Sequence, residues 1–307
     1  MCLLLSLLFC SERKELSLKI YFLDVGHGDC IFLQTPDDGI RGNGEYEGLC
    51  ILIDGGEERM GREILLPFLR QNRIDTIDCL IATHFHSDHI GGLIPVLESF
   101  PVRMILTNTK EKKGELNGRF LELAAQEGCS WRIVQAGETI FWGKEMEVFI
   151  LNPEKLGKEE NNNSIVLKIE YEGKKILLTG DIEGKERKED SKNCRFVERS
   201  LVDKNKEILR SHILKVAHHG SETSSTEEFL AAVRPEVAVI TAGRKKFGGH
   251  ILPDSSVVLR LRKFGAQIYR TDFGDTDYQT APGDDHILIK ISSGKIDVRY
   301  LHKFLIF

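Results

Sequence analysis

The stretch Thr83-His84-Phe85-His86-Ser87-Asp88-His89-Ile90-Gly91-Gly92 places four potential metal ligands within six residues. It follows the apolar run 79–82, and residues 93–100 after it have helical spacing. A strand that ends just before such residues holds them on a short, rigid loop. The first two histidines can point toward one ion, and the Asp-His pair toward a second ion beside it. Because imidazole and carboxylate suit Zn²⁺, Mn²⁺ or iron rather than Ca²⁺ or Mg²⁺, the spacing predicts a metal site.

Other apolar runs also end directly before polar residues. They are 49–53 before Asp54-Gly55-Gly56, 175–179 before Gly180-Asp181, and 213–217 before His218-His219-Gly220. Strand ends that gather at one edge of a sheet form a rigid cleft, which is where α/β proteins place their chemistry. We therefore expect these residues to share one site.

Hydrophobic periodicity predicts a chain rich in both strands and helices. Strands are expected at 16–23, 30–33, 49–53, 79–82, 103–107, 131–135, 139–142, 145–151, 165–169, 175–179, 213–217, 236–241, 266–270, 286–291 and 296–301. Helices are expected at 60–72, 93–100, 118–127, 227–233 and 254–264, and in the second half of the charged stretch 183–210. Two strand-rich halves without a linker predict one domain, 16–307, with two sheets packed face to face and helices outside.

Composition narrows the class of protein. The chain has 307 residues, of which 41% are hydrophobic and 29% charged, as in soluble globular proteins. Its net charge of −5 argues against coating nucleic acid by bulk charge, although a local basic groove remains possible. Seven cysteines without C-x-x-C spacing make a disulfide framework or a cysteine zinc site unlikely and favour a reducing, cytoplasmic compartment.

The amino terminus, 1–15, begins with an apolar segment, 1–10, that is too short to span a bilayer. It lacks the basic residues that open a signal peptide. Cys10 after two apolar residues suggests, as an alternative to the cytoplasm, a lipid-anchored export signal. We favour a buried first strand or a misplaced start codon. No other segment is apolar enough to cross a membrane, and the sequence points to no protein partner.

Ordered motifs along residues 18–275 resemble the metallo-β-lactamase superfamily, and within it the ComEC-like hydrolase domains. Asp24-Val25-Gly26-His27-Gly28-Asp29 is similar to that group's D-V-G-Q-G-D opening, with His27 where Gln is usual. Further matches follow in order: the metal loop, Asn161–Ser164, 178–181, 214–221, Gly248-Gly249-His250 and 269–272.

The resemblance implies a four-layer αββα sandwich with a centre for two divalent ions, Zn or Mn. In this group His84 and His86 would hold the first ion, Asp88 and His89 the second, and Asp181 would bridge them. The last ligand would be His219, which directly precedes glycine. His218 would then contact substrate or orient a ligand, and the reverse assignment of these two histidines stays open.

Two departures limit the resemblance. No histidine occurs between Ile90 and Gly180, where many superfamily members supply a further ligand. Asn163 and Ser164 occupy that neighbourhood, which implies that the first ion is under-ligated, more labile or completed by water. This weakens the interpretation as a β-lactamase. ComEC also carries a membrane channel that this chain lacks, so DNA transport is not carried over.

Two adjacent ions can share one water, lower its pKa toward ~7 and polarise the scissile group. Asp88 would also orient the nucleophile, and His218 or His250 would stabilise a phosphate oxygen or protonate the leaving group. Asp54 is expected either to fix a ligand histidine or to form a turn.

His27 and Asp29 are expected either to reach the cleft rim or to act as turn formers. The basic cluster Arg244-Lys245-Lys246, just before His250, would contact a phosphate backbone or form a solvated loop.

The leading prediction is thus a metallohydrolase that acts as a phosphodiesterase or nuclease, with a phosphodiester or nucleic acid as substrate. One alternative is hydrolysis of a small ester, lactone or phosphocholine-like group. Another, of a different class, is a non-catalytic metal-binding subunit. The complete set of ligands argues against the last, because a degenerate module usually loses ligands.

Overall fold

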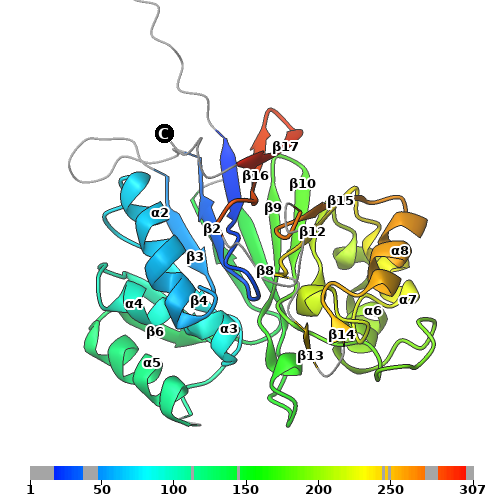
Figure 1. The fold of residues 1–307 in the computed structure, drawn as a ribbon, viewed down its shortest axis with the longest axis horizontal. Helices are drawn as coiled ribbons and strands as arrows, with labels where there is room; N and C mark the ends of the chain where they lie inside the picture. The colour runs from blue at the N-terminus through cyan, green and yellow to red at the C-terminus, as the bar shows by residue number, and fades with distance from the viewer. Residues whose placement is uncertain are drawn as a thin grey trace, which may run out of the picture.

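The computed structural model describes residues 17–36, 48–111, 114–143, 146–243, 246–247, 250–273 and 283–301. In this part of the chain two mixed sheets pack face to face, and helices cover both outer faces (Figure 1). The predicted αββα sandwich is confirmed. The predictions for the N-terminal segment 1–15 lie outside the described residues, as does most of the loop 36–48.

The first sheet has eight strands among the described residues and changes from antiparallel to parallel pairing. Their order is β17 (Lys295–Leu301), β16 (His286–Ser292), β1 (Leu18–Phe22), β2 (Ile31–Gln34), β3 (Cys50–Ile53), β4 (Cys79–Ala82), β5 (Met104–Thr107) and β6 (Ser130–Ile133). Pairing is antiparallel from β17 to β3 and parallel from β3 to β6. The carboxyl ends of β1, β3 and β4 therefore share one edge.

The second sheet has the same mixed character. Its order is β15 (Gln267–Arg270), β12 (Val237–Ile240), β11 (Ile213–Lys215), β10 (Lys174–Leu178), β9 (Val166–Tyr171), β8 (Glu147–Asn152) and β7 (Thr139–Phe141). Strands β15, β12, β11 and β10 pair parallel, so their carboxyl ends also share an edge. The remaining pairs are antiparallel.

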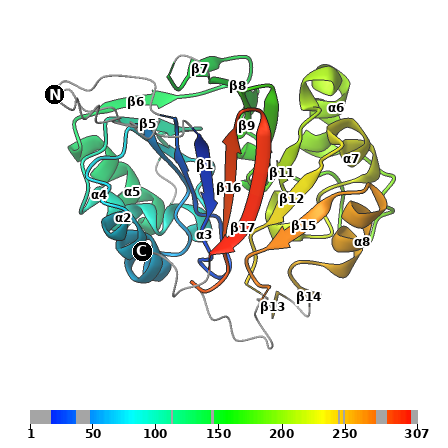
Figure 2. The same ribbon diagram turned by 90° about the horizontal axis from the view of Figure 1, so that it is seen from above.

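Helices flank the paired sheets, as the view from above makes clear (Figure 2). Those beside the first sheet are α1 (Glu58–Met60), a π-helical turn (Gly61–Leu65), α2 (Leu66–Gln71), α3 (Ser87–Ile90), α4 (Leu93–Leu97) and α5 (Glu115–Gln126). Those beside the second are α6 (Phe196–Leu209), α7 (Glu227–Val233) and α8 (Ser255–Lys263). No helix in the described ranges is long and apolar enough to cross a membrane.

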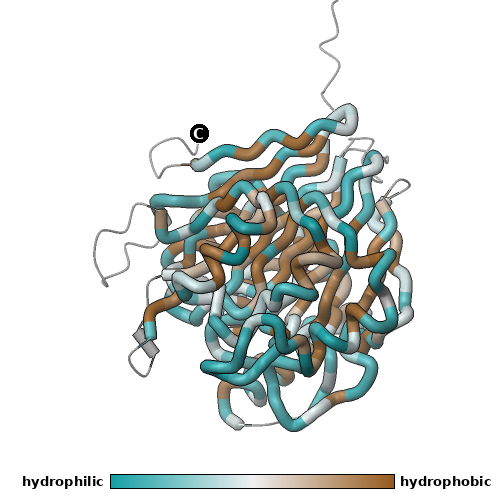
Figure 3. The backbone as a smooth tube through the Cα atoms, turned by 90° about the vertical axis from the view of Figure 1, so that its right-hand side faces the viewer, coloured by the Kyte–Doolittle hydropathy of each residue, from teal (hydrophilic) through white to brown (hydrophobic). Residues whose placement is uncertain are grey.

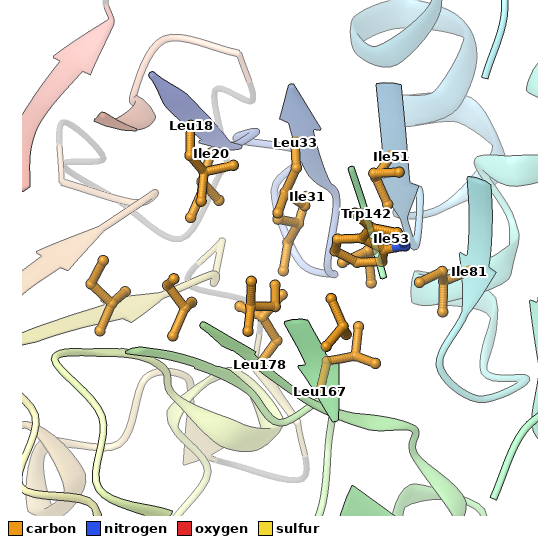
Figure 4. Close-up of a cluster of buried hydrophobic side chains, with 14 of the residues drawn as sticks. Leu18, Ile20, Ile31, Leu33, Ile51, Ile53, Ile81, Trp142, Leu167 and Leu178 are labelled. Atoms are coloured by element: carbon orange, nitrogen blue, oxygen red, sulfur yellow. The ribbon is translucent and has the colours of Figure 1, made fainter. Parts of the chain in front are cut away.

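The main core lies between the sheets. In β1 the side chains of Leu18, Ile20 and Phe22 are buried there, whereas Tyr21 packs on the other face against Phe68 of α2. Side chains of β1, β2 and β3 point toward Leu167 and Leu178 of the second sheet (Figure 4). Because both faces of β3, β4 and β12 are covered, these strands are apolar along their whole length. Brown segments run through the interior in Figure 3.

The chain departs from the sequence prediction in two places. Residues 60–72 were expected to form one helix, but α1 and α2 are joined by the π-helical turn. Pro67 at the start of α2 has no N–H to donate to the preceding turn, which disfavours a continuous α-helix. A short hairpin of β13 (Lys246–Phe247) and β14 (His250–Ile251) was not predicted, because two-residue strands leave no periodic pattern.

Candidate metal centre

The polar residues that follow the strands of both sheets meet at one edge of the sandwich. Asp54 follows β3, the metal loop follows β4, Asp181 lies beyond β10 and His219 beyond β11. The α3 end of this site is tightly packed, since a Cβ on Gly92 would lie 1.8 Å from the carbonyl oxygen of Gly55. The gathering of strand ends that the sequence predicts is therefore present.

Asp54 fixes the metal loop. It is fully buried, has a φ of +55° and ends β3 in a turn. Its carboxylate accepts hydrogen bonds from the backbone N–H (2.8 Å) and the hydroxyl (2.6 Å) of Thr83, and lies 2.8 Å from Nδ1 of His89. Asp54 therefore contacts a histidine of the metal loop, as one of the two predicted roles requires.

A first group of candidate ligands comprises His84, His89 and Asp181. Their ligand atoms lie within 4.8 Å of one another, and all three residues are buried. Nε2 of His89 is 3.2 Å from Oδ2 of Asp181. His86 is exposed at the cleft, and its Nδ1 lies 3.1 Å from Nε2 of His84. His84 and His86 therefore lie side by side, as expected. His89 was expected beside Asp88 at the second ion, but it also lies close to Asp181 and His84 of the first group.

Ser164 and Asn163 behave differently from each other. The Ser164 hydroxyl lies 3.3 Å from Nδ1 of His84 and accepts a 3.0 Å hydrogen bond from the backbone N–H of Asp181. The side chain of Asn163 accepts from the backbone N–H of Gly157 (2.7 Å) and donates to its carbonyl (3.2 Å). Ser164 therefore reaches the site, and Asn163 holds its own loop together.

A second group comprises His27, Asp88 and His219, whose ligand atoms also lie within 4.8 Å of one another. Oδ2 of Asp88 is 3.2 Å from Nε2 of His27 and 3.4 Å from Nε2 of His219. Nε2 of His219 is also 3.1 Å from Oδ2 of Asp181. Asp181 consequently stands between the two groups, in contact with a histidine of each.

The histidines at 218 and 219 point to different places. Both have positive φ, of 51° and 52°, in the short helical turn after β11. His219 is buried beside Asp88 and Asp181, with Nδ1 2.9 Å from the carbonyl oxygen of Thr241. His218 is partly exposed, and its Nδ1 lies 3.2 Å from the Glu183 carboxylate. This placement favours His219 as the ligand and leaves His218 facing the cleft.

A buried lysine that the sequence analysis gave no role lies beneath the centre. Nζ of Lys215, at the end of β11, is 2.5 Å from the Asp29 carboxylate and 3.4 Å from that of Asp181, and it donates to the carbonyl of Gly180 at 3.0 Å. Asp29 also accepts a 2.5 Å hydrogen bond from the Thr241 hydroxyl. One lysine inside the apolar run 213–217 was the available signal, because a buried charge requires a partner.

Electrostatics at the centre follow from burial and these contacts. Burial disfavours the charged form of Lys215, but Asp29 and Asp181 outweigh it and raise the pKa of the lysine. Burial likewise opposes the ionised form of Asp29, yet Lys215 and His219 hold the pKa of that carboxyl below its ordinary value. The buried lysine therefore keeps the carboxylates beneath the site ionised.

The histidines divide into two classes. Burial lowers the pKa of His84 well below its ordinary value and that of His27 to about 4. At His89 and His219 burial acts in the same direction, but Asp181 outweighs it and raises both pKa values. Nε2 of each of these two residues is buried and makes no hydrogen bond within the described residues. Imidazole nitrogens and carboxylate oxygens in this arrangement fit a divalent cation.

An open cleft of about 260 Å³ lies over the two groups. Its lining includes His218, His250, Arg187 and Asn161. His250 also belongs to a separate group with Glu222 and Asp254 at the rim. Arg187 and Asn161 were missed as site residues. Arg187 lies in the charged stretch 183–210, for which the sequence predicted a helix in the second half and no site residue. Residues 244–245 of the predicted basic cluster lie outside the described residues, as does the side chain of Lys246.

Comparisons with known proteins agree with this geometry. The family described as the metallo-beta-lactamase superfamily matches residues 44–244. ComE operon protein 3 of Bacillus subtilis (strain 168) is 29% identical over 90% of this chain and 34% of its own length. Competence protein ComA of Neisseria gonorrhoeae is 31% identical over 72% of this chain and 28% of its own. The chain thus spans about a third of the length of these relatives.

Structural comparison supports the fold. YhfI from Bacillus subtilis, a metallo-beta-lactamase fold protein, superposes with a TM-score of 0.53 at 12% identity and covers 83% of this chain and 96% of its own. The resemblance drawn from the motifs, including that to the ComEC-like group, is confirmed by these relatives. The chain belongs to the metallo-beta-lactamase superfamily, a fold that generally carries hydrolases and binds divalent metal ions.

Proposed function

We propose that this chain hydrolyses phosphodiesters with two divalent ions, and that nucleic acid is its substrate. The observation that carries the proposal is the place of Asp181. Its Oδ2 lies 3.2 Å from Nε2 of His89 and 3.1 Å from Nε2 of His219, so one carboxylate serves both ligand groups. Bound ions would supply a water of lowered pKa and a positive field on a phosphoryl oxygen.

The residues around the cleft have separate tasks in this proposal. Asp88 has a partly exposed carboxylate that faces the cleft and can accept a hydrogen bond from the attacking water. His218 lies 3.2 Å from the Glu183 carboxylate, a contact that would orient its ring toward the leaving oxygen. These roles place a proton acceptor and a proton donor in the same cleft.

Arg187 supports a phosphate substrate. Its side chain lines the cleft and is 34% exposed, and its buried Nη1 lies 3.7 Å from the Glu222 carboxylate. A guanidinium offers paired donors that match phosphate oxygens. Two relatives are named Recombination protein 2 and Competence protein ComA, which supports nucleic acid as the substrate over a small ester.

The test compares wild type, Asp181→Asn and Arg187→Gln on bis(p-nitrophenyl) phosphate and on single- and double-stranded DNA, with Zn²⁺ or Mn²⁺. We expect Asp181→Asn to lose metal and activity on all substrates. Arg187→Gln should keep its metal but raise the KM for phosphodiesters by about 10- to 150-fold, as removal of a charge-assisted contact costs roughly 1.5–3 kcal/mol.

Wild type that cleaves an ester or lactone but no phosphodiester under either metal would transfer the assignment to a small-molecule hydrolase. Wild type that binds metal and hydrolyses none of these substrates would favour the non-catalytic metal-binding subunit.

A further inference from the structure

The turn between β1 and β2 brings His27 to the second ligand group. The His27 side chain is 6% exposed, its Nε2 lies 3.2 Å from Oδ2 of Asp88, and its ring centroid is 4.4 Å from that of His219. We infer that His27 is a fourth protein ligand of the ion shared by Asp88, His219 and Asp181. The inference rests on the metal centre of the proposed function, but not on its substrate.

The distances have the right size for a shared ion. Ligand atoms at tetrahedral corners, each 2.0–2.1 Å from a zinc-like ion, are separated by about 3.3–3.4 Å. Here the separations are 3.2 Å from His27 to Asp88, 3.4 Å from Asp88 to His219 and 3.1 Å from His219 to Asp181. These three separations match edges of such a tetrahedron. The donor atoms of His27, Asp88 and His219 lie within 4.8 Å of one another, and Asp181 adjoins this group through His219.

The backbone holds His27 in this position. A Cβ on Gly28 would lie 2.4 Å from the carbonyl oxygen of Asp88, and one on Gly243 would lie 2.6 Å from the nitrogen of His27. The backbone N–H of Asp29 donates to the carbonyl of Asp88 at 3.1 Å. The turn is thus packed directly against the segment that carries Asp88, so His27 needs no rearrangement to reach the same ion.

This assignment makes the two halves of the centre unequal. His27 would close the ion beside His219 with four protein donors, as in sites that hold metal tightly. The group of His84, His89 and Asp181 has three buried protein donors, and the neighbouring His86 is exposed at the cleft, where water or substrate could take its place. The protein should therefore bind its two ions with distinct affinities, and His27 should set the tighter one.

The experiment titrates metal-free wild type, His27→Gln and His27→Ala with Co²⁺ and with Zn²⁺ against a chromophoric chelator. Glutamine can still donate a hydrogen bond to Asp88 but provides no imidazole. The control is His212→Gln, at the opposite end of β11, where the ring accepts a hydrogen bond from the backbone of Lys175. Circular dichroism and thermal unfolding verify that each variant is folded.

We expect the tighter site of both His27 variants to weaken by more than about 100-fold, since loss of a residue that only orients a ligand costs about 10–100-fold. The Co²⁺ absorption of that site should also lose the intensity typical of four-coordination, and His212→Gln should match wild type. A folded His27→Gln with wild-type affinity and Co²⁺ spectrum overturns the inference. If wild type shows the His27-dependent site but cleaves no phosphodiester, the proposed function is refuted and the inference about His27 stands.

Discussion

Asp54→Asn should weaken metal binding through a change of tautomer at His89. In wild type, one oxygen of the Asp54 carboxylate accepts a hydrogen bond from the backbone N–H of Thr83. The other oxygen lies 2.8 Å from Nδ1 of His89. Asparagine can keep the first bond and, like aspartate, tolerates the φ of +55° at this position. Its amide would then face Nδ1 as a donor. The ring proton must move to Nε2, the atom that faces Asp181 and would bind metal.

The expected size of the effect follows from the kind of contact that is lost. Partners that orient a ligand histidine contribute about 10–100-fold to metal affinity, or about 1.4–2.7 kcal/mol. Asp54 is completely buried, so water cannot replace its carboxylate. We therefore expect the weaker site, at His84, His89 and Asp181, to lose affinity near the upper end of this range, while the His219 site changes little.

A chelator-competition titration measures the affinity, and the nitrogen chemical shifts of the His89 ring report its tautomer. Asp78→Asn is the matched control, because Asp78 is also a buried aspartate and accepts a 2.8 Å hydrogen bond from the backbone N–H of Cys50 at the other end of β3. Equal losses of affinity in both variants, or an unchanged tautomer in Asp54→Asn, would refute the reasoning.

Three further predictions concern buried charge. Lys215→Met should lower the free energy of unfolding of the metal-free protein by about 3–5 kcal/mol, because two carboxylates lose their buried partner. Zn²⁺ should restore part of this stability, as measured by urea unfolding. Burial lowers the pKa of Lys168 to about 7. The unfolded chain therefore binds more protons between pH 7 and 10, and stability relative to Lys168→Met should rise by up to about 1.4 kcal/mol per pH unit. The raised pKa values of His89 and His219 predict that Zn²⁺ displaces protons from the metal-free protein near pH 7, which a pH-stat detects.

The layers and the edge that carries the site could be predicted from local pattern. An apolar run such as 79–82 indicates a buried strand. The histidines and aspartate that follow it indicate where the strand ends. Parallel strands then bring such ends together without any knowledge of particular contacts. Asp54, Asp88, Asp181 and His219 meet for this reason.

The direction of a side chain could not be predicted in the same way. His218 and His219 are adjacent and identical in type, and both have positive φ, yet one ring contacts Glu183 and the other Asp181. Such backbone angles are set by packing around the turn, where a Cβ on Gly220 would lie 2.7 Å from the side chain of Pro253. This contact joins residues far apart along the chain.

Long-range partners explain why the role of the buried lysine was also missed. A charge inside the apolar run 213–217 requires a counter-charge, but the run does not say which one. The partner, Asp29, lies in the turn between β1 and β2, and the Thr241 hydroxyl that donates to it follows β12. The turn between β1 and β2 also carries His27. The local sequence around His27 is typical of a turn. His27 becomes a candidate ligand only because the ends of β1, β4 and β11 meet, which depends on the sheet topology and not on any single motif.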